Sequence, residues 1–507
     1  MRQSRCGRGM KALLSAVVAL WCTAALAGPG DVLKLGAQRF PPLFGNPYSP
    51  IAQPAALPLQ AIFDSLTRVG PEGRVEPGLA VAWTQEAPNT WVFTLRDGIV
   101  FSNGEPFNAA AVIAALDYLR TDEGRRDSLA SQDVKTSMAS YRARDDLIVE
   151  IITTSPDPIL PLHLSFLRIP APRHWATLGR DKFQLAPVGT GPFKVESWSE
   201  ARLELIAHPR SWRAPLLGRI TMLEIADPTV RVQAFASRAV DIAMALGPED
   251  EPAVAALGGR LLARASPSVN YLLFVTVKDS PLKDVRVRRA LNYAADKGRI
   301  LKAFLADAVA PVGQFSHPLA FGFDPSVPPY PYDPDRARKL LAEAGYAQGF
   351  AFTALLDPSA GGGITEWYQL LAQSFAEVGV SMAIRPAPAT RMTEYVQTGN
   401  WPAEAFAFTF AGFDSLRGYR FRSCAAANPY HCDPGLTPLI AAAQAATDLG
   451  TRLIATRAAL AYERENPPGV LLWPGVGFDA VAGHVRDYVV EQDHVRFDLV
   501  RLASPGE

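Results

Sequence analysis

The chain has 507 residues, with 50 lysines and arginines against 50 aspartates and glutamates, so its formal net charge is zero. Without a basic excess, neither nucleic acid nor an anionic lipid surface is an expected partner. Single hydrophobic cores stop growing at about 250–300 residues, so a chain of this length is expected to divide into two or more lobes.

The first residues have the features of a secretory signal peptide. Four basic side chains, the last at Lys11, precede the apolar run ALLSAVVALWCTAALA, which ends in Ala25-Leu26-Ala27. Cys22 directly follows Trp21, which does not suit processing to a lipid anchor. No later apolar run reaches the roughly 18 residues of a membrane span. We therefore expect an exported periplasmic chain that begins near Gly28, carries no lipid and has a formal charge of about −4.

The first elements of the mature chain are predicted to mix strands and helices. DVLKLGA (31–37) is typical of a buried strand. Alternating apolar and polar residues in WVFTLRDGIVF (91–101), around Asp97-Gly98, predict a β-hairpin. Asn108 is placed to cap a helix with an apolar face, which consists of Val112, Leu116 and Leu119.

The stretch GTGPFKVESW (189–198) has two glycines and a lysine, as phosphate-binding loops do. A P-loop needs the pattern Gly-x-x-x-x-Gly-Lys-[Ser/Thr] followed by a helix, and a dinucleotide fingerprint needs a third glycine that opens a helix. This stretch matches neither pattern. Pro192 and the residues from Phe193 to Trp198 instead predict a turn followed by a strand.

The second half contains several helical segments. DVRVRRALNYAADKGRIL (284–301) is expected to form one helix and then a second, which Asp296 caps. Asp333-Pro334 predicts the start of another helix, and Gly345 its end. The apolar face of the first helix is Val287, Ala290, Leu291 and Ala294. No internal repeat or long linker interrupts the chain, so the lobes are expected to share strands or crossings.

Two cysteines remain after the signal peptide, Cys424 and Cys432 in CAAANPYHC. In an oxidising compartment, two cysteines that flank a turn-rich segment are expected to form a disulfide. The alternative of a metal site is weaker, because His431 beside Cys432 offers no tetrahedral ligand set.

Five segments together are similar to the family 5 extracellular solute-binding proteins, the peptide, nickel and opine receptors of bacterial ABC importers. The segments are AIFDSLTRVGPEGRVEPGLAVAW, WVFTLRDGIVFSNGEPFNAAAV, GTGPFKVESW, VRRALNYAADKGRIL and DPDRARKLLAEAGY. Their order and spacing match that family over nearly all of the mature chain. In this resemblance the glycines of GTGPF permit a tight turn that returns the chain to its main lobe.

The resemblance implies an α/β fold of the type II periplasmic-binding-protein kind, with two large lobes around a ligand cleft and a smaller inserted lobe. Ligand would drive closure by contacting both large lobes better in the closed state. The implied divisions are a signal peptide (1–27), a discontinuous lobe I (28–59, 187–268 and 485–507), lobe II (60–186) and lobe III (269–484).

The resemblance also places residues at the cleft. The loop after the first strand would contribute Pro42, Leu43 and Phe44. The segment AFTFAGFDSLRGYRF would contribute Gly412, Phe413 and Asp414, although peptide binders have a tryptophan and a spacer before the aspartate. Aromatic candidates for the cleft walls, each also compatible with an ordinary core position, are Tyr271, Trp473 and Phe478.

Two interpretations of Asp414 stay open at this point. A carboxylate in a dry cleft would pair with a cationic group of the ligand. Alternatively, Asp414 would pair with Arg417 or Arg420 on its own loop.

The resemblance implies a monomeric ABC importer receptor that binds a small molecule or peptide and partners the permease subunits and, through them, the ATPase. A peptide or another amine-bearing solute is the expected ligand, with no cofactor, metal or catalytic residue. A secreted hydrolase is the main alternative, although neither a Gly-x-Ser-x-Gly elbow nor His-Glu-x-x-His occurs in the chain. A binding protein with a sensor or chaperone role is the third.

Overall fold

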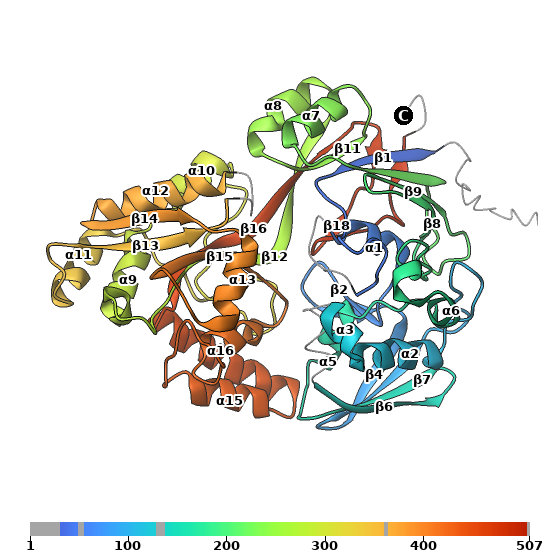
Figure 1. Ribbon diagram of the computed structural model, residues 1–507, viewed down its shortest axis with the longest axis horizontal. Coiled ribbons are helices and arrows are strands. Elements are labelled where there is room, and N and C mark those ends of the chain that lie inside the picture. The colour runs from blue at the N-terminus through green and yellow to red at the C-terminus, as the bar shows by residue number, and fades with distance from the viewer. Residues whose placement is uncertain (1–30, 49–54, 128–136, 359–362, 504–507) are drawn as a thin grey trace, which may run out of the picture.

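The computed structural model describes residues 31–48, 55–127, 137–358 and 363–503. Two large bodies lie side by side and are joined by long strands that cross between them (Figure 1). The predicted signal peptide and its cleavage site lie outside the described residues.

Ten strands form one mixed sheet that extends through both bodies. β1 runs parallel to β10 and β11, whereas β12 and β16 are antiparallel to each other. In spatial order the strands are β14 (Val380–Pro386), β13 (Phe350–Leu356), β15 (Ala405–Ala411), β12 (Arg260–Phe274), β16 (Gly469–Val481), β11 (Ile242–Leu246), β1 (Val32–Ala37), β10 (Arg219–Glu224), β9 (Arg202–Ala207) and β8 (Phe193–Trp198).

The long strands β12 and β16 connect the two bodies. Residues 260–265 of β12 pair with the end of β16 beside β11, and residues 268–274 pair with β15 on the other side. The register of the pair shifts between Ala265 and Val269. The expectation that the lobes share strands is therefore confirmed.

Lobe I is our name for the body around β1 and β8–β11, whose core includes Leu33, Phe63, Phe193 and Met244. Its other elements are α1 (Leu57–Ile62), α7 (Pro228–Ala236), η2 (Pro248–Asp250), α8 (Glu251–Ala256), β17 (Val485–Arg486), β18 (Val490–Glu491), β19 (His494–Val495) and β20 (Arg501–Leu502).

Lobe II is our name for the smaller body around a separate antiparallel sheet, of order β4-β5-β7-β6, with a core of its own. The strands are β4 (Ala80–Ala87), β5 (Thr90–Leu95), β7 (Ile148–Thr153) and β6 (Met138–Asp145). Around them lie β2 (Thr67–Val69), β3 (Val75–Pro77), α2 (Ala109–Arg120), α3 (Asp122–Asp127), α5 (Leu160–His163), η1 (Leu164–Phe166) and α6 (Pro172–Phe183).

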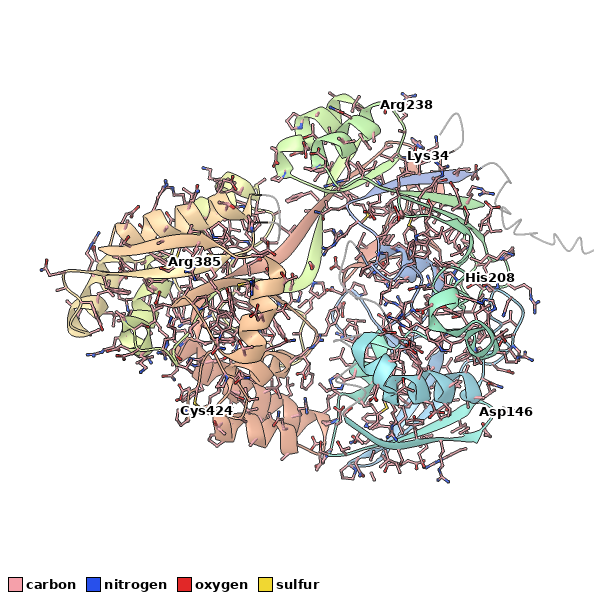
Figure 2. All side chains as sticks on the ribbon, viewed as in Figure 1. Lys34, Asp146, His208, Arg238, Arg385 and Cys424 are labelled. Atoms are coloured by element: carbon pink, nitrogen blue, oxygen red, sulfur yellow. A yellow bond between two sulfur atoms is a disulfide. The ribbon has the colours of Figure 1, made fainter. Side chains whose placement is uncertain are left out.

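Lobe III is our name for the second large body, around β13–β15 and the adjoining parts of β12 and β16. Figure 2 shows Arg385 of lobe III in the left-hand body and Asp146 of lobe II at the lower right of the other body. The helices of lobe III are η3 (Pro281–Lys283), α9 (Val285–Ala294), α10 (Lys297–Phe304), α11 (Pro334–Glu343), α12 (Ile364–Ala376), α13 (Ala389–Thr398), η4 (Ser415–Gly418), α14 (Tyr419–Arg422), α15 (Thr437–Ala445) and α16 (Leu449–Glu465).

Most of the predicted elements are present. The strand after residue 31 and the helices after Asn108, Asp284, Asp296 and Asp333 are confirmed. Each of the three aspartates accepts a backbone N–H of the helix that it caps, whereas the Asn108 side chain makes no such bond.

The hairpin predicted around Asp97-Gly98 is wrong. Gly98 does turn the chain, with φ of +71°. However, β5 pairs with β4 and β7, and the segment after the turn forms only an isolated bridge between Val100 and Pro106. The alternating pattern of 91–95 reflects a central strand whose partners come from elsewhere in lobe II.

The glycines of GTGPF adjoin the α1 backbone. A Cβ atom at Gly189 would overlap the carbonyl of Ile62, and one at Gly191 would overlap that of Ala61. Gly191 N donates to the Ile62 carbonyl at 2.9 Å, and β8 follows directly. Close approach of two backbones therefore explains the glycines, and the predicted strand is confirmed.

Candidate functional site

A cavity of about 650 Å³ lies between the lobes, against residues 266–268 of β12. This volume is typical of sites for small solutes. All three lobes contribute to its walls, among them Gln60 and Arg213 of lobe I, Phe166 and Arg168 of lobe II, and Gly412 and Phe413 of lobe III.

Asp64, on the wall of the cavity, is held by a dense set of donors. Arg213 Nε donates to its Oδ1 at 2.7 Å, and Arg213 Nη1 lies 3.2 Å from Asp498. Thr190 Oγ1 and Trp212 Nε1 donate to Asp64 Oδ2 at 2.8 and 2.9 Å. This carboxylate therefore positions the wall and has little capacity left for a ligand.

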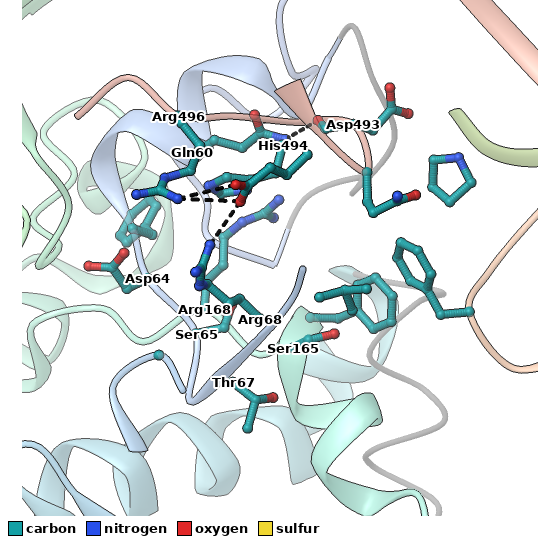
Figure 3. A pocket seen from close by; sticks show the side chains of 18 of the residues that line it. Gln60, Asp64, Ser65, Thr67, Arg68, Ser165, Arg168, Asp493, His494 and Arg496 are labelled. Carbon is teal, nitrogen blue, oxygen red and sulfur yellow. Dashed lines mark hydrogen bonds and ion pairs between the residues drawn. The ribbon is translucent and has the colours of Figure 1, made fainter. Parts of the chain in front are cut away.

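A second carboxylate, Glu491, comes from the turn between β18 and β19. Arg68 Nη1 lies 2.8 Å and Arg496 Nη1 3.4 Å from Glu491 Oε2 (Figure 3). The two residues of the turn, Gln492 and Asp493, have φ of +49° and +65°, which lets a tight hairpin reach the cavity.

An ion-pair network joins β12, β16 and this turn. Arg264 of β12 pairs with Asp493 and, through Nε, with Asp479 of β16 at 3.1 Å. Ser266 Oγ donates to Asp493 at 3.0 Å. Burial raises the pKa of Asp493 although Arg264 opposes this effect. The network fixes the C-terminal segment at the place where the connecting strands meet the cavity.

Neither Arg96 nor Arg168 of the cavity wall has a carboxylate partner among the described residues. Arg96 donates to the Gly78 carbonyl through Nε at 3.3 Å and stacks over Trp212. Arg168 is 8% exposed, and its Nη1 donates to the Pro47 carbonyl at 3.2 Å. Burial lowers the pKa of Arg168 to about 10, which still leaves it charged at neutral pH.

His494 also lines the cavity. Burial and the nearby charge of Arg213 lower the pKa of His494 to about 3, so the imidazole is neutral. The charged side chains of the lining residues are then six arginines and three carboxylates. The wall therefore has an excess of positive charge.

Lobes II and III touch beside the cavity. His163 Nδ1 of α5 donates to Asp157 Oδ2 at 2.9 Å, and His163 Nε2 lies 4.0 Å from Asp414 Oδ2 of lobe III. Phe166 and Phe413 stack across the same boundary with ring centroids 6.0 Å apart. Polar and apolar contacts thus meet at one edge of the cavity.

The opposite charges at this contact stabilise the charged forms of His163 and Asp414. Burial opposes the charged imidazole, yet Asp157 and Asp414 outweigh this effect and raise the pKa of His163 to about 10. Burial likewise opposes the charge of Asp414, but His163 and Arg452 hold the pKa of that carboxyl below its usual range. Arg452 Nη2 of α16 lies 3.4 Å from Asp414 Oδ2.

The structure shows partners of Asp414 that neither sequence interpretation named. Both lie outside its own loop, whereas an arginine of that loop, Arg417 or Arg420, was the local alternative. The side chain of Arg420 lies outside the described part of the chain. The sequence could not indicate these partners, because Arg452 and His163 are far from Asp414 in the chain and approach it only in the tertiary fold.

Of the predicted cleft residues, Gly412 and Phe413 line the cavity, and Asp414 follows them directly. Pro42, Leu43 and Phe44 do not lie on its wall. Phe44 instead packs edge-on against Trp198 of β8, with centroids 5.9 Å apart.

The three aromatic candidates lie in the core. Tyr271 stacks on Phe315 at 5.2 Å, and Trp473 meets Trp367 at 5.8 Å. Phe478 is also buried in the same core. Tyr271, Trp473 and Phe478 belong to central strands of the sheet, and none of the three lines the cavity, which meets β12 only at residues 266–268.

Sequence reasoning missed the arginines of the cavity. Arg168 stands in SFLRIPAP, between the buried Leu167 and Ile169. A charged residue inside an apolar run was the available signal, since such residues are rarely buried without a reason. The contributions of Arg68, Arg96 and Arg213 depend on tertiary contacts and had no local signal.

The predicted disulfide is confirmed between Cys424 and Cys432, with Cα atoms 4.5 Å apart. Beside it, His431 Nδ1 lies 2.8 Å from Thr276 Oγ1. Within the described ranges no cluster of three or more histidine, cysteine or carboxylate side chains is suited to a metal ion. No helix in the same ranges has the length and apolar character needed to cross a membrane.

Comparison with known proteins gives a family match over more than half of the chain. The model for bacterial extracellular solute-binding proteins, family 5 Middle, matches residues 74–425. The glutathione-binding protein GsiB of Salmonella typhimurium is 26% identical over 404 residues, which are 78% of this chain and 76% of that protein.

Solved structures of similar fold include NikA from Brucella suis in complex with Fe(III)-EDTA. It has a TM-score of 0.79 and 21% identity, and the match covers 93% of this chain and 99% of that one. The periplasmic binding protein DppA from Helicobacter pylori, in complex with the peptide STSA, gives a TM-score of 0.76 and 18% identity. That match covers 95% of this chain and 99% of the other.

Proposed function

This chain belongs to the bacterial extracellular solute-binding proteins of family 5, and we propose that it captures a small solute between its lobes for an ABC importer. The receptor role follows from the family. The division into lobes at the predicted residues, the nature of the solute, the partners and the cellular location are parts of the proposal.

The cavity between the lobes is the observation that carries this function. Its walls come from all three lobes, while the chain passes between lobes I and III in only two strands of the described residues, β12 and β16. Few connecting segments permit a hinge, and ligand contacts on both sides favour the closed state. Closure is then a shift of the population toward the closed state, because the solute makes better contacts with the lobes in that state than in the open one.

The proposed cargo is a peptide or peptide-like solute. A relative that binds glutathione and a structure of similar fold that holds the peptide STSA support this class. The expected role of Asp414 in binding an amine has less support, because that carboxylate already has Arg452 and His163 as partners. Gly412 and Phe413 are proposed to contact the solute from lobe III.

The proposed partners are the permease subunits of the importer and, through them, its ATPase. The chain is proposed to act as a monomer in the periplasm after cleavage of the signal peptide near Gly28. The function needs binding and release alone, so we assign no catalytic residue and no cofactor.

Native mass spectrometry tests the proposal most simply. Protein purified under mild conditions from the periplasm of its own bacterium should carry a solute of a few hundred daltons, which denaturation should release. If the bound state is absent both in this preparation and after incubation with a periplasmic extract, the receptor function proposed here is contradicted.

A further inference from the structure

The proposed function leaves open which chemical group of the solute the cavity recognises. The arginines of the wall differ in whether a carboxylate of the protein pairs with them, and this difference indicates the recognised group. Arg68 pairs with Glu491, Arg213 with Asp64 and Asp498, and Arg496 with Glu491 and Asp498. These side chains have internal counter-charges.

Arg168 has no such counter-charge. It is more than nine-tenths buried and lines the cavity, and none of the described carboxylates pairs with it. A buried guanidinium without an anion is costly, so its retention points to an anion supplied from outside.

The hydrogen bonds of Arg168 define the shape of that anion. Nη1 is already bonded to the Pro47 carbonyl, and nothing in the described residues accepts from Nε or Nη2. Nε and Nη2 together form the side edge of the guanidinium, two parallel donors with the spacing of carboxylate oxygens. Figure 3 shows Arg168 among the side chains that surround the cavity.

We propose that Arg168 binds a carboxylate of the captured solute side-on, through Nε and Nη2. The inference rests on the function proposed above and adds the recognised group to it. A phosphate would use three oxygens and usually several donors or a helix N-terminus. One free edge of one guanidinium matches a single carboxylate better.

The test uses matched pairs of solutes, measured by thermal shift and calorimetry. The pairs are glutathione and its diethyl ester, trialanine and trialanine amide, and succinate and succinamide, with glycerol 3-phosphate and inorganic phosphate as a separate arm. At least one carboxylate should bind, and its neutral counterpart should not. Arg168→Gln should weaken that binding by about 30-fold or more.

Stability of the empty protein separates recognition from a structural role. Arg168→Gln removes an uncompensated buried charge, so the empty variant should melt at the same temperature as the wild type or higher. Arg213→Gln is the matched control: it removes a paired arginine of the same wall and should lower the melting temperature. Arg168→Lys keeps the positive charge but lacks the two parallel donors of the guanidinium, so this variant should retain part of the affinity.

Several outcomes would overturn the inference: equal binding of acid and neutral counterpart, unchanged affinity in Arg168→Gln, binding of the phosphates alone, or no binding of any carboxylate. A solute without a carboxylate, found on the protein by native mass spectrometry, would overturn it and leave the receptor function intact. Absence of any bound solute would contradict the receptor function itself.

Discussion

His163 and Asp414 meet across the boundary between lobes II and III, with Nε2 and Oδ2 4.0 Å apart. Each has a second partner on its own side, Asp157 for the histidine and Arg452 for the aspartate. The four side chains alternate in charge when His163 is protonated. A contact of this kind favours the approach of the lobes while leaving each half paired when they separate.

Asp414→Asn is expected to destabilise the empty protein by roughly 3 kcal/mol, because Arg452 would keep a buried charge without its partner. Chemical denaturation of the variant and wild type measures this difference. Asp279→Asn, whose side chain is fully exposed, is the control and should change stability little. An unchanged unfolding free energy combined with lost solute affinity would instead indicate that the cation comes from the solute.

His163→Gln is expected to weaken the contact between lobes, with an effect that depends on pH. The raised pKa of His163, about 10, means that its contribution is fully present below its ordinary pKa of about 6.5. That contribution is lost as the pH rises through 10. Asp157 and Asp414 have lowered pKa values, so their contributions are present above about pH 4 and are lost as the pH falls further.

The measurement is the unfolding free energy of wild type and His163→Gln between pH 4.5 and 10. The difference should be largest from about pH 4.5 to 6.5 and should shrink steadily toward pH 10. A difference that grows with pH would contradict the assigned protonation of His163.

Gly189→Ala is expected to lower stability by several kcal/mol or prevent folding, since its methyl group would overlap the Ile62 carbonyl in a part of lobe I where both backbones are fixed. Gly298→Ala in α10 is the matched control. Only a distant Asp296 oxygen, at 3.8 Å, lies near its Cβ position, and alanine favours a helix. Thermal melts of both variants test this; equal melting temperatures would disprove the close approach.

The double variant Cys424→Ser/Cys432→Ser is expected to lose roughly 2–3 kcal/mol of stability, by the chain-entropy estimate for a short closed loop. Solute affinity should stay the same, because neither cysteine lies on the cavity wall. Thiol titration of the unreduced, denatured wild type provides the check on the bond, and two free thiols would refute it.

Local elements and family-level architecture could be predicted from the sequence, but the charges of the site could not. The helices that follow Asp284, Asp296 and Asp333 could be predicted from capping residues and apolar spacing, which are local signals. The hairpin at Asp97-Gly98 failed because a turn signal does not specify which strand pairs with β5.

In the candidate site too, local sequence signals did not specify contacts between distant residues. Gly412 and Phe413 were placed at the cavity by the resemblance, whereas Tyr271, Trp473 and Phe478 lie in the core. Aromatic side chains suit both a core and a cavity wall, so a local sequence pattern does not show in which of the two they lie. Which arginines have partners depends on contacts between residues far apart in the chain, such as Arg213 with Asp64.

The distance between lobes II and III, with and without solute, tests the central claim most directly. Labels at Asp146→Cys and Arg385→Cys, both exposed, report this distance by fluorescence energy transfer (Figure 2). Addition of the solute identified by native mass spectrometry should shorten the distance and narrow its distribution, and the same labels in Arg168→Gln should respond only at much higher solute concentration. An unchanged distance under a saturating amount of a solute proven to bind would contradict capture by lobe closure.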